Sequence, residues 1–218
     1  MAAGEGEALQ AAEGFDHPIL TESLRRIRGW LGATGLRGVE QEVLERLVHG
    51  SGDLGIAAVL RFSPGACTAG MEALAAGAPI LTDTAMAAAA VTPMARRTFA
   101  NAVHCVLQRA PAVAPPGTTR SAAGMALSLA AHPGAVVLIG SAPTALEVML
   151  ELVRSGAVPP PALVIGVPVG FVGVAESKRA LAASGLPQIR LEGSRGGAGM
   201  AAAAANALLR RGWLDQAA

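Results

Sequence analysis

The fold is decided by the stretch Val164-Ile165-Gly166-Val167-Pro168-Val169-Gly170-Phe171-Val172-Gly173-Val174-Ala175-Glu176-Ser177-Lys178. An apolar, β-branched run ends at a glycine, crosses a loop of glycine and proline, and leads into a glutamate, a serine and a lysine. This order is typical of a buried parallel strand whose carboxyl end meets a ligand. Lys178 is the only lysine among 17 lysine and arginine residues. A solvated lysine at a helix start also fits, but we expect Lys178 to contact a ligand, with Gly166 and Gly170 allowing close approach to the backbone.

The same design occurs upstream in Val136-Val137-Leu138-Ile139-Gly140-Ser141-Ala142-Pro143-Thr144. An apolar strand again ends at a glycine, here Gly140, and a proline follows at the expected first turn of a helix. Two such turns predict adjacent strands whose following helices direct their amino ends into one crevice. Neither turn matches a phosphate-binding loop, so a nucleotide ligand is not favoured.

Length and composition favour one α/β domain. The chain has 218 residues, enough for a substantial core, and we assign residues 15–218 to a single domain. Residues 1–14 are rich in alanine, glycine and glutamate and are predicted to be a disordered extension. No apolar run approaches the roughly 20 residues of a membrane helix, and the amino terminus does not resemble a signal peptide. We therefore expect a cytoplasmic protein without a membrane partner.

Charge and cysteine usage exclude several other functions. The formal net charge is +1 and aromatic residues make up 3% of the chain, which argues against a nucleic-acid partner. Cys67 and Cys105 are isolated in the sequence, so a disulfide is not expected. His104 and Cys105 are neighbours on an expected strand and face opposite ways, and no other spacing resembles a metal site. We therefore expect no metal site.

Strand and helix patterns alternate along the chain. This alternation predicts a single doubly wound, mainly parallel sheet with helices on both faces. Asp83, at the carboxyl end of the strand at 79–81, joins the candidate ligand-binding residues. The strands are expected at 54–62, 79–81, 103–107, 135–139, 162–166 and 188–192. The helices are expected at 16–31, 39–49, 63–77, 84–90, 122–131, 143–155, 175–184 and 198–210.

His49 is the candidate general acid. It ends an amphipathic helix, where the negative end of the helix dipole favours the imidazolium form. Small residues follow it, and Asp53 is placed to orient the ring. The alternative is a histidine that only ends its helix.

Arginines at two helix starts suggest an anionic ligand. Arg120 and Ser121 follow two threonines, and Arg195 lies in a glycine-rich entry to the last helix. Arginine side chains and free helix amides bind carboxylates or phosphates in a forked geometry. With Lys178 and the glycine turns, they predict a polyanionic ligand. Ser23 and Arg28 on the first helix are weaker candidates.

Read together, these segments resemble the precorrin-8X methylmutase family over about residues 17–210. The Pro-Val-Gly-Phe-Val-Gly stretch with Glu-Ser-Lys is the most specific match. The matching pieces are Ser23…Ile27-Arg28, Leu47-Val48-His49-Gly50-Ser51-Gly52-Asp53, Phe62-Ser63-Pro64-Gly65-Ala66, Ala76-Gly77-Ala78-Pro79-Ile80-Leu81-Thr82-Asp83, Thr119-Arg120-Ser121-Ala122-Ala123, Ile139-Gly140-Ser141-Ala142-Pro143-Thr144-Ala145-Leu146, Gly166 to Lys178, and Gly196-Gly197…Ala201.

The resemblance implies an isomerase that moves a methyl group between adjacent carbons of ring C of a tetrapyrrole, giving hydrogenobyrinate in cobalamin biosynthesis. It implies that His49 donates a proton to the ring and that Ser23 and Arg120 lie at the substrate. It also implies a homodimer that needs no metal or cofactor.

The sequence departs from the family's pattern in three places. Gly50-Ser51 replaces bulkier residues, which should enlarge the pocket rather than abolish the chemistry. Leu20, Glu22 and Leu24 replace the usual Tyr, Arg and Phe on the first helix. Near residues 92–97 the usual Thr-Arg pattern is replaced, leaving Arg96 or Arg97 as the substitute. Two other functions remain open, which are the same rearrangement on cobalt-precorrin-8 and a non-catalytic corrinoid carrier.

Overall fold

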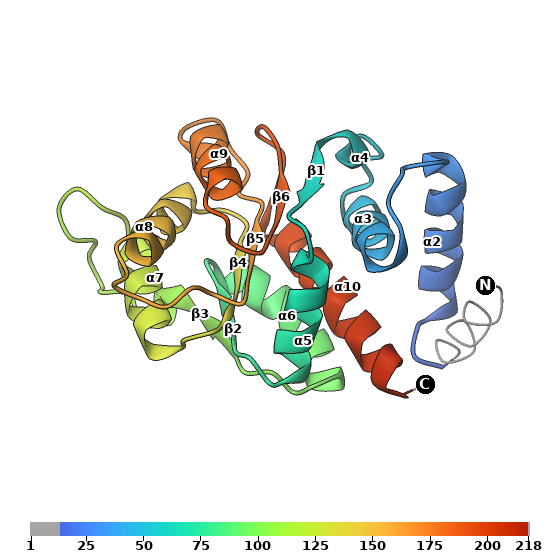
Figure 1. The fold of residues 1–218 in the computed structure, drawn as a ribbon, viewed down its shortest axis with the longest axis horizontal. Coiled ribbons are helices and arrows are strands. Elements are labelled where there is room, and N and C mark those ends of the chain that lie inside the picture. Colours follow the sequence, from blue (N-terminus) through green and yellow to red (C-terminus); the bar gives the residue numbers. More distant parts are fainter. Residues whose placement is uncertain (1–13, 218) are drawn as a thin grey trace.

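The computed structural model describes residues 14–217, and within them six strands form one sheet in the order β1-β6-β5-β4-β2-β3 (Figure 1). Every neighbouring pair is parallel except β1 and β6, which are antiparallel. The mainly parallel sheet predicted from the sequence is therefore confirmed. The strands are β1 (Leu60–Phe62), β2 (Ile80–Thr82), β3 (Val103–Cys105), β4 (Val136–Ile139), β5 (Leu163–Gly166) and β6 (Gln188–Leu191).

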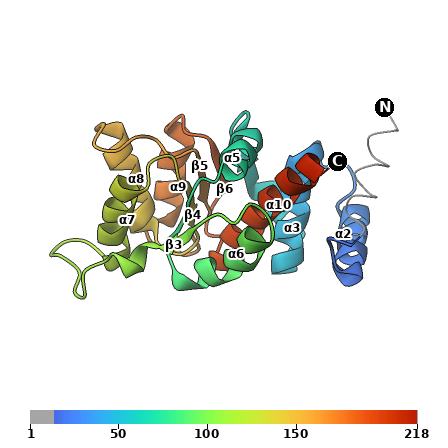
Figure 2. The same cartoon turned by 90° about the horizontal axis from the view of Figure 1, so that it is seen from below.

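Helices cover both faces of this sheet (Figure 2). On one face lie α3 (Gly38–Ser51), α5 (Ala66–Ala75), α6 (Ala85–Arg97) and α10 (Ala198–Ala217), and on the other α7 (Arg120–Ala131), α8 (Pro143–Arg154) and α9 (Val174–Ala183). The outer helix α2 (Pro18–Leu31) packs on α3. The short elements are α4 (Ile56–Val59) and the 3-10 turn η1 (Val106–Gln108).

Strand β4 shows why two helical layers are needed. Its four residues are all fully buried, with Val136 and Leu138 in one core cluster and Val137 and Ile139 in the other. Successive side chains of a strand point to opposite faces, so a strand that is apolar throughout must be covered on both sides.

The chain reverses its direction across the sheet between β2 and β4. It runs outward from β2 to β3, then returns to the other side of β2 and continues through β4, β5 and β6. The loops after these strands gather at one edge of the sheet, called here the carboxyl edge. In open α/β sheets this edge, and the reversal point above all, is where ligands bind. The predicted adjacency of the strands before Gly140 and Gly166 is confirmed, because β4 pairs with β5.

Several expected boundaries were wrong. Residues 54–59 belong to a turn and α4 rather than a strand, because the Asp53 carboxylate accepts the Gly55 N–H and starts a helical turn. Helix α5 begins at Ala66 rather than at the proline before it, because Gly65 adopts a left-handed φ of 72°. Helix α6 continues past Ala90 to Arg97, with Val91 and Ala95 buried in the core.

The remaining expectations concern the amino-terminal extension, the two cysteines and membrane helices. The predicted disordered extension lies, apart from Gly14, outside the described residues. Cys67 and Cys105 are buried and free. None of the helices within residues 14–217 combines the length and the apolar character that crossing a membrane requires.

Candidate functional site

His49 lies in the last turn of α3, and its ring contacts α2. The Ser23 hydroxyl and the Nδ1 atom of His49 are 2.8 Å apart, within hydrogen-bonding distance. The expectation that Asp53 orients the ring was wrong, since the Asp53 carboxylate accepts the Gly55 N–H at 2.8 Å and pairs with Arg195. The partner of the histidine is therefore Ser23, a hydroxyl 26 residues earlier in the chain.

The pKa of His49 is lowered from its usual value, contrary to the expectation from the helix dipole. Partial burial is the main cause, and the positive charge of Arg46 is the second. Arg46 lies three residues earlier on α3, and its buried Nε atom has no hydrogen-bond partner among residues 14–217. Desolvation and a like charge nearby both disfavour the imidazolium form, whereas the helix dipole favours it. The imidazolium of His49 is thus less populated but a stronger acid.

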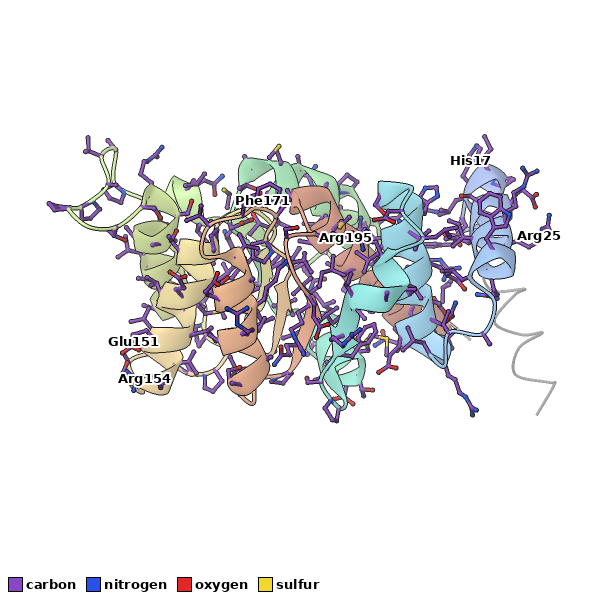
Figure 3. The ribbon with its side chains drawn as sticks, turned by 90° about the horizontal axis from the view of Figure 1, so that it is seen from above. His17, Arg25, Glu151, Arg154, Phe171 and Arg195 are labelled. Carbon is purple, nitrogen blue, oxygen red and sulfur yellow. The ribbon has the colours of Figure 1, made fainter. Side chains whose placement is uncertain are left out.

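An open hollow of about 490 Å³ borders Ser23 on the flank of α2. Figure 3 shows Arg25 and His17 on this outer helix. Arg25 and Arg26 both pair with Glu22 at 2.7 Å, so the charges beside the hollow are partly neutralised. The hollow is lined by Pro18, Ile19, Glu22, Ser23 and Arg26.

Arg195 reaches from the loop after β6 to the turn that follows α3. Its guanidinium donates to the Gly55 carbonyl oxygen at 3.2 Å and pairs with the Asp53 carboxylate at 3.3 Å. The side chain remains about half exposed. The loop after β6 and the end of α3, which carries His49, therefore meet at the carboxyl edge.

Lys178 is buried on α9, with 2% of its surface exposed. Its ammonium donates to the carbonyl oxygens of Gly193 at 2.8 Å and Arg195 at 2.6 Å, and burial lowers its pKa to about 8. Lys178 is thus not a solvated surface residue. Its observed partners are main-chain carbonyls, and a ligand contact stays a prediction.

Asp83 fills the reversal point between β2 and β4. Its Oδ2 atom accepts the N–H groups of Gly140, Ser141 and Ala142 at 3.1, 2.6 and 2.8 Å. The side chain is fully buried, and within the described part of the chain its Oδ1 atom has no hydrogen-bond partner. The amides expected to bind a ligand at the amino end of α8 are therefore engaged by the protein's own carboxylate.

The glycines of the two strand turns allow close packing. A Cβ atom at Gly140 would lie 2.6 Å from the backbone of Ala198, and one at Gly166 would lie 2.3 Å from a Leu181 methyl group. Gly170 adopts a φ of 143° and donates its N–H to the Ser194 carbonyl oxygen, joining the loop after β5 to the loop after β6. Ligand contacts by these glycines stay predictions.

The loop after β5 also presents an apolar tip, which the sequence reasoning missed as a binding feature. Phe171 is 94% exposed and Val172 is 87% exposed. Figure 3 shows Phe171 and Arg195 on this side of the molecule, while Glu151 and Arg154 lie at the far end of α8. Large apolar side chains at this exposure are typical of an interaction surface.

Arg120 and Ser121 begin α7, also at the carboxyl edge. The Thr119 hydroxyl caps this helix and lies 2.8 Å from that of Thr144 on α8, so the two helix starts are neighbours. The exposed Arg120 side chain donates to the Pro111 carbonyl oxygen at 2.9 Å. Ser121 is partly exposed.

Three other predicted residues lie in different surroundings. Arg28 pairs with the buried Glu45 at 2.7 Å, further from the carboxyl edge than Ser23. Arg97 stacks on Phe15 with 3.9 Å to the ring centre, whereas Arg96 lines a separate hollow of about 390 Å³ near β3. Among residues 14–217, no group of three or more His, Cys, Asp or Glu side chains is placed to hold a metal ion.

Comparison with known proteins identifies the family. The precorrin-8X methylmutase family model matches residues 18–211. A precorrin-8X methylmutase of Pseudomonas aeruginosa is 47% identical over 195 residues, covering 87% of this chain and 93% of that protein. A cobalt-precorrin-8 methylmutase of Synechocystis is 38% identical over 215 residues, covering 92% and 98%.

The solved structures agree. The precorrin-8X methylmutase of Thermus thermophilus superposes with a TM-score of 0.80 at 39% identity, covering 90% of this chain and 98% of that one. The family-model match over residues 18–211 spans the sheet, the helices on both faces and the segments that carry Ser23, His49 and Arg120. The chain therefore belongs to the precorrin-8X methylmutase family, a family of isomerases in cobalamin biosynthesis.

Proposed function

We propose that this enzyme moves a methyl group between adjacent carbons of ring C of precorrin-8X, giving hydrogenobyrinate, with His49 as the general acid. The observation that carries the proposal is the hydrogen bond between Ser23 and His49, at the end of a helix that Arg195 ties to the carboxyl edge. An imidazolium whose Nδ1–H donates to Ser23 presents its Nε2–H to the substrate, so one nitrogen is held while the other reacts.

The protonation step follows from the chemistry of the conjugated ring. A proton given by His49 to a ring nitrogen draws electrons out of the conjugated system, which lowers the barrier for the methyl group to migrate. The product is an isomer of the substrate, so the proton returns to the histidine and the reaction needs no other reactant. General acid catalysis of this kind contributes about 10²- to 10⁴-fold in rate.

Binding of the substrate is assigned to the carboxyl edge. The carboxylates of the macrocycle would be met by Arg120 and Arg195, whose guanidinium groups are exposed or half exposed. The exposed Phe171 and Val172 would cover part of its apolar ring system. Ligand contacts of Ser121, Gly166, Gly170 and Arg28 are kept as proposals. Asp83 and Gly140 instead bond each other, and Lys178 bonds main-chain carbonyl oxygens.

The relatives differ in whether the substrate that they are named for contains cobalt. The Pseudomonas relative is named for the metal-free substrate and the Synechocystis relative for the cobalt form. We propose the metal-free form, because the Pseudomonas relative shares more identity with this chain, 47% against 38%. The cobalt form is the alternative.

A homodimer is proposed as the working form. Ile19 and Trp30 on the outer helix α2 are 73% and 68% exposed, and a second copy would cover them. Light scattering at the assay concentration measures the mass directly, and a monomer would contradict the proposal. The cytoplasmic location stays a prediction of the sequence.

The deciding experiment mixes the purified protein with precorrin-8X and with cobalt-precorrin-8 and follows the absorbance spectrum. Conversion of many equivalents of precorrin-8X is expected. Faster turnover of the cobalt form would reverse the substrate assignment. A spectral change that stops at one equivalent per chain would indicate the corrinoid carrier instead.

A further inference from the structure

Lys178 is a buried cation, with 2% of the residue exposed. In the hydrogen bonds that the structure shows, its ammonium donates to two main-chain carbonyl oxygens, those of Gly193 and Arg195, and to no carboxylate. Burying a charge is costly, so such a group is retained where its hydrogen bonds order the chain around it.

The segment that Lys178 holds, loop 193–197, is the one that carries Arg195. Two further hydrogen bonds and one close backbone approach define the path of this loop. Gly170 donates to the Ser194 carbonyl oxygen at 3.2 Å, Gly197 donates to that of Val167 at 2.9 Å, and a Cβ atom at Gly196 would lie 2.0 Å from the same Val167 oxygen. Residues 193–195 are nevertheless exposed to solvent. The buried ammonium therefore anchors this exposed part of the loop from below.

Loop 193–197 in turn holds the end of the helix that carries His49. The Arg195 guanidinium contacts the Asp53 carboxylate and the Gly55 carbonyl oxygen, four and six residues beyond His49 in the chain. The hydrogen bonds thus run from α9 through the loop to the turn after α3, without Lys178 contacting His49 itself.

We propose that Lys178 is a positioning residue that holds loop 193–197, so that Arg195 keeps the turn after His49 in place. A lysine suits this role because its compact ammonium can donate to two carbonyl oxygens converging on one point, whereas a planar guanidinium needs more room and a forked partner. The part of the proposal that concerns turnover rests on the proposed function, while the part that concerns the loop does not.

Trypsin tests the loop without any substrate. The bond after Arg195 lies in the exposed part of the loop, and the bond after Arg154 on α8 serves as an internal reference. In Lys178→Met, cleavage after Arg195 relative to cleavage after Arg154 should rise at least about tenfold, because the loop opens locally. Arg179→Met, which removes an exposed cation next in sequence, should leave the ratio unchanged. An unchanged ratio in Lys178→Met would overturn the proposal.

A parallel rise at both bonds in Lys178→Met would mean that the whole protein has loosened. Lys178→Gln then decides by the same ratio, because its side chain stays polar but is one atom shorter and uncharged, so it should not reach both the Gly193 and Arg195 carbonyl oxygens. A selective rise after Arg195 in this variant supports the anchor, and the lack of one refutes it.

A double-mutant cycle on turnover tests the route through Arg195. If Lys178 acts by placing Arg195, then Lys178→Met together with Arg195→Ala should be no slower than the worse single variant by more than about twofold. Losses that multiply would show that Lys178 acts independently of Arg195 and would refute the positioning role. Failure of the proposed reaction is distinguishable, because it would abolish turnover in the unmodified enzyme while the trypsin result still stands.

Discussion

The contact between Ser23 and His49 gives the sharpest quantitative expectation. Removing the hydroxyl by Ser23→Ala deletes one hydrogen bond, whose Oγ and Nδ1 atoms are 2.8 Å apart in the structure. A typical hydrogen bond contributes a net 0.5–1.5 kcal/mol, so turnover should fall by about 2- to 13-fold. His49→Ala removes the proton donor itself, and turnover should then fall by about a hundredfold or more, with corrinoid binding largely retained.

The assay is single-turnover conversion of precorrin-8X followed by absorbance, with Ser155→Ala as the control. The Ser155 hydroxyl bonds only carbonyl oxygens within α8, so this variant should behave as the parent enzyme. If Ser23 acts only by orienting the ring, it has nothing to orient in a His49→Ala background, and the double variant should match His49→Ala.

Two results would refute this reasoning. A loss on Ser23→Ala as large as that on His49→Ala would mean that the serine takes part in the chemistry directly. Near-normal turnover by His49→Ala would remove the histidine from the mechanism altogether.

Four further predictions follow from the other contacts. Because the acid form of His49 is required, kcat/KM should fall as pH rises through its lowered pKa, and Arg46→Met should move that fall to higher pH; an unmoved profile would contradict the assignment. Arg120→Ala should weaken binding of hydrogenobyrinate about tenfold or more and reduce its salt dependence, and indifference to both would contradict the polyanion model. Phe171→Ser should raise KM with little change in thermal stability, because the ring is 94% exposed; an unchanged KM would remove it from the site. Asp83→Asn should lower the unfolding free energy by about 2 kcal/mol in urea titrations, because the carboxylate accepts three N–H groups, and an unchanged midpoint would contradict this account.

The alternation of apolar strands and helices carried enough information to predict the fold. Strands as uniformly apolar as Val136–Ile139 have no stable place except between two helical layers, so the class of the sheet followed from the sequence pattern. Boundaries were less predictable where a side chain redirected the backbone. At 54–59 a run of apolar residues favoured a strand, but the hydrogen bond from the Gly55 N–H to Asp53 turned the chain into α4.

Sequence reasoning gave a set of candidate site residues, whose contacts with the substrate stay predictions, but it did not give the contacts among those residues. His49, Ser23, Arg120 and Arg195 were expected at the substrate, but sequence spacing does not reveal that Ser23 rather than Asp53 is the partner of His49. That contact depends on how α2 packs across α3. The predicted direction of the His49 pKa shift was wrong for the same reason. The helix end was visible in the sequence, whereas the partial desolvation of this exposed ring and its nearness to Arg46 were not.

The amino end of α8 shows why a motif at the carboxyl edge does not by itself define a ligand site. Strand, glycine and first-turn proline assembled the three free amides that favour an anion, as expected. The reversal of the chain between β2 and β4 then brought Asp83 onto those same amides, so the protein supplies the anion itself. Of the predicted site residues in the described part of the chain, Arg120 and Arg195 present exposed guanidinium groups that can donate to the carboxylates of a substrate. The chemistry is therefore expected on the rim between α7, loop 193–197 and the end of α3, beside His49, rather than in the crevice between β2 and β4.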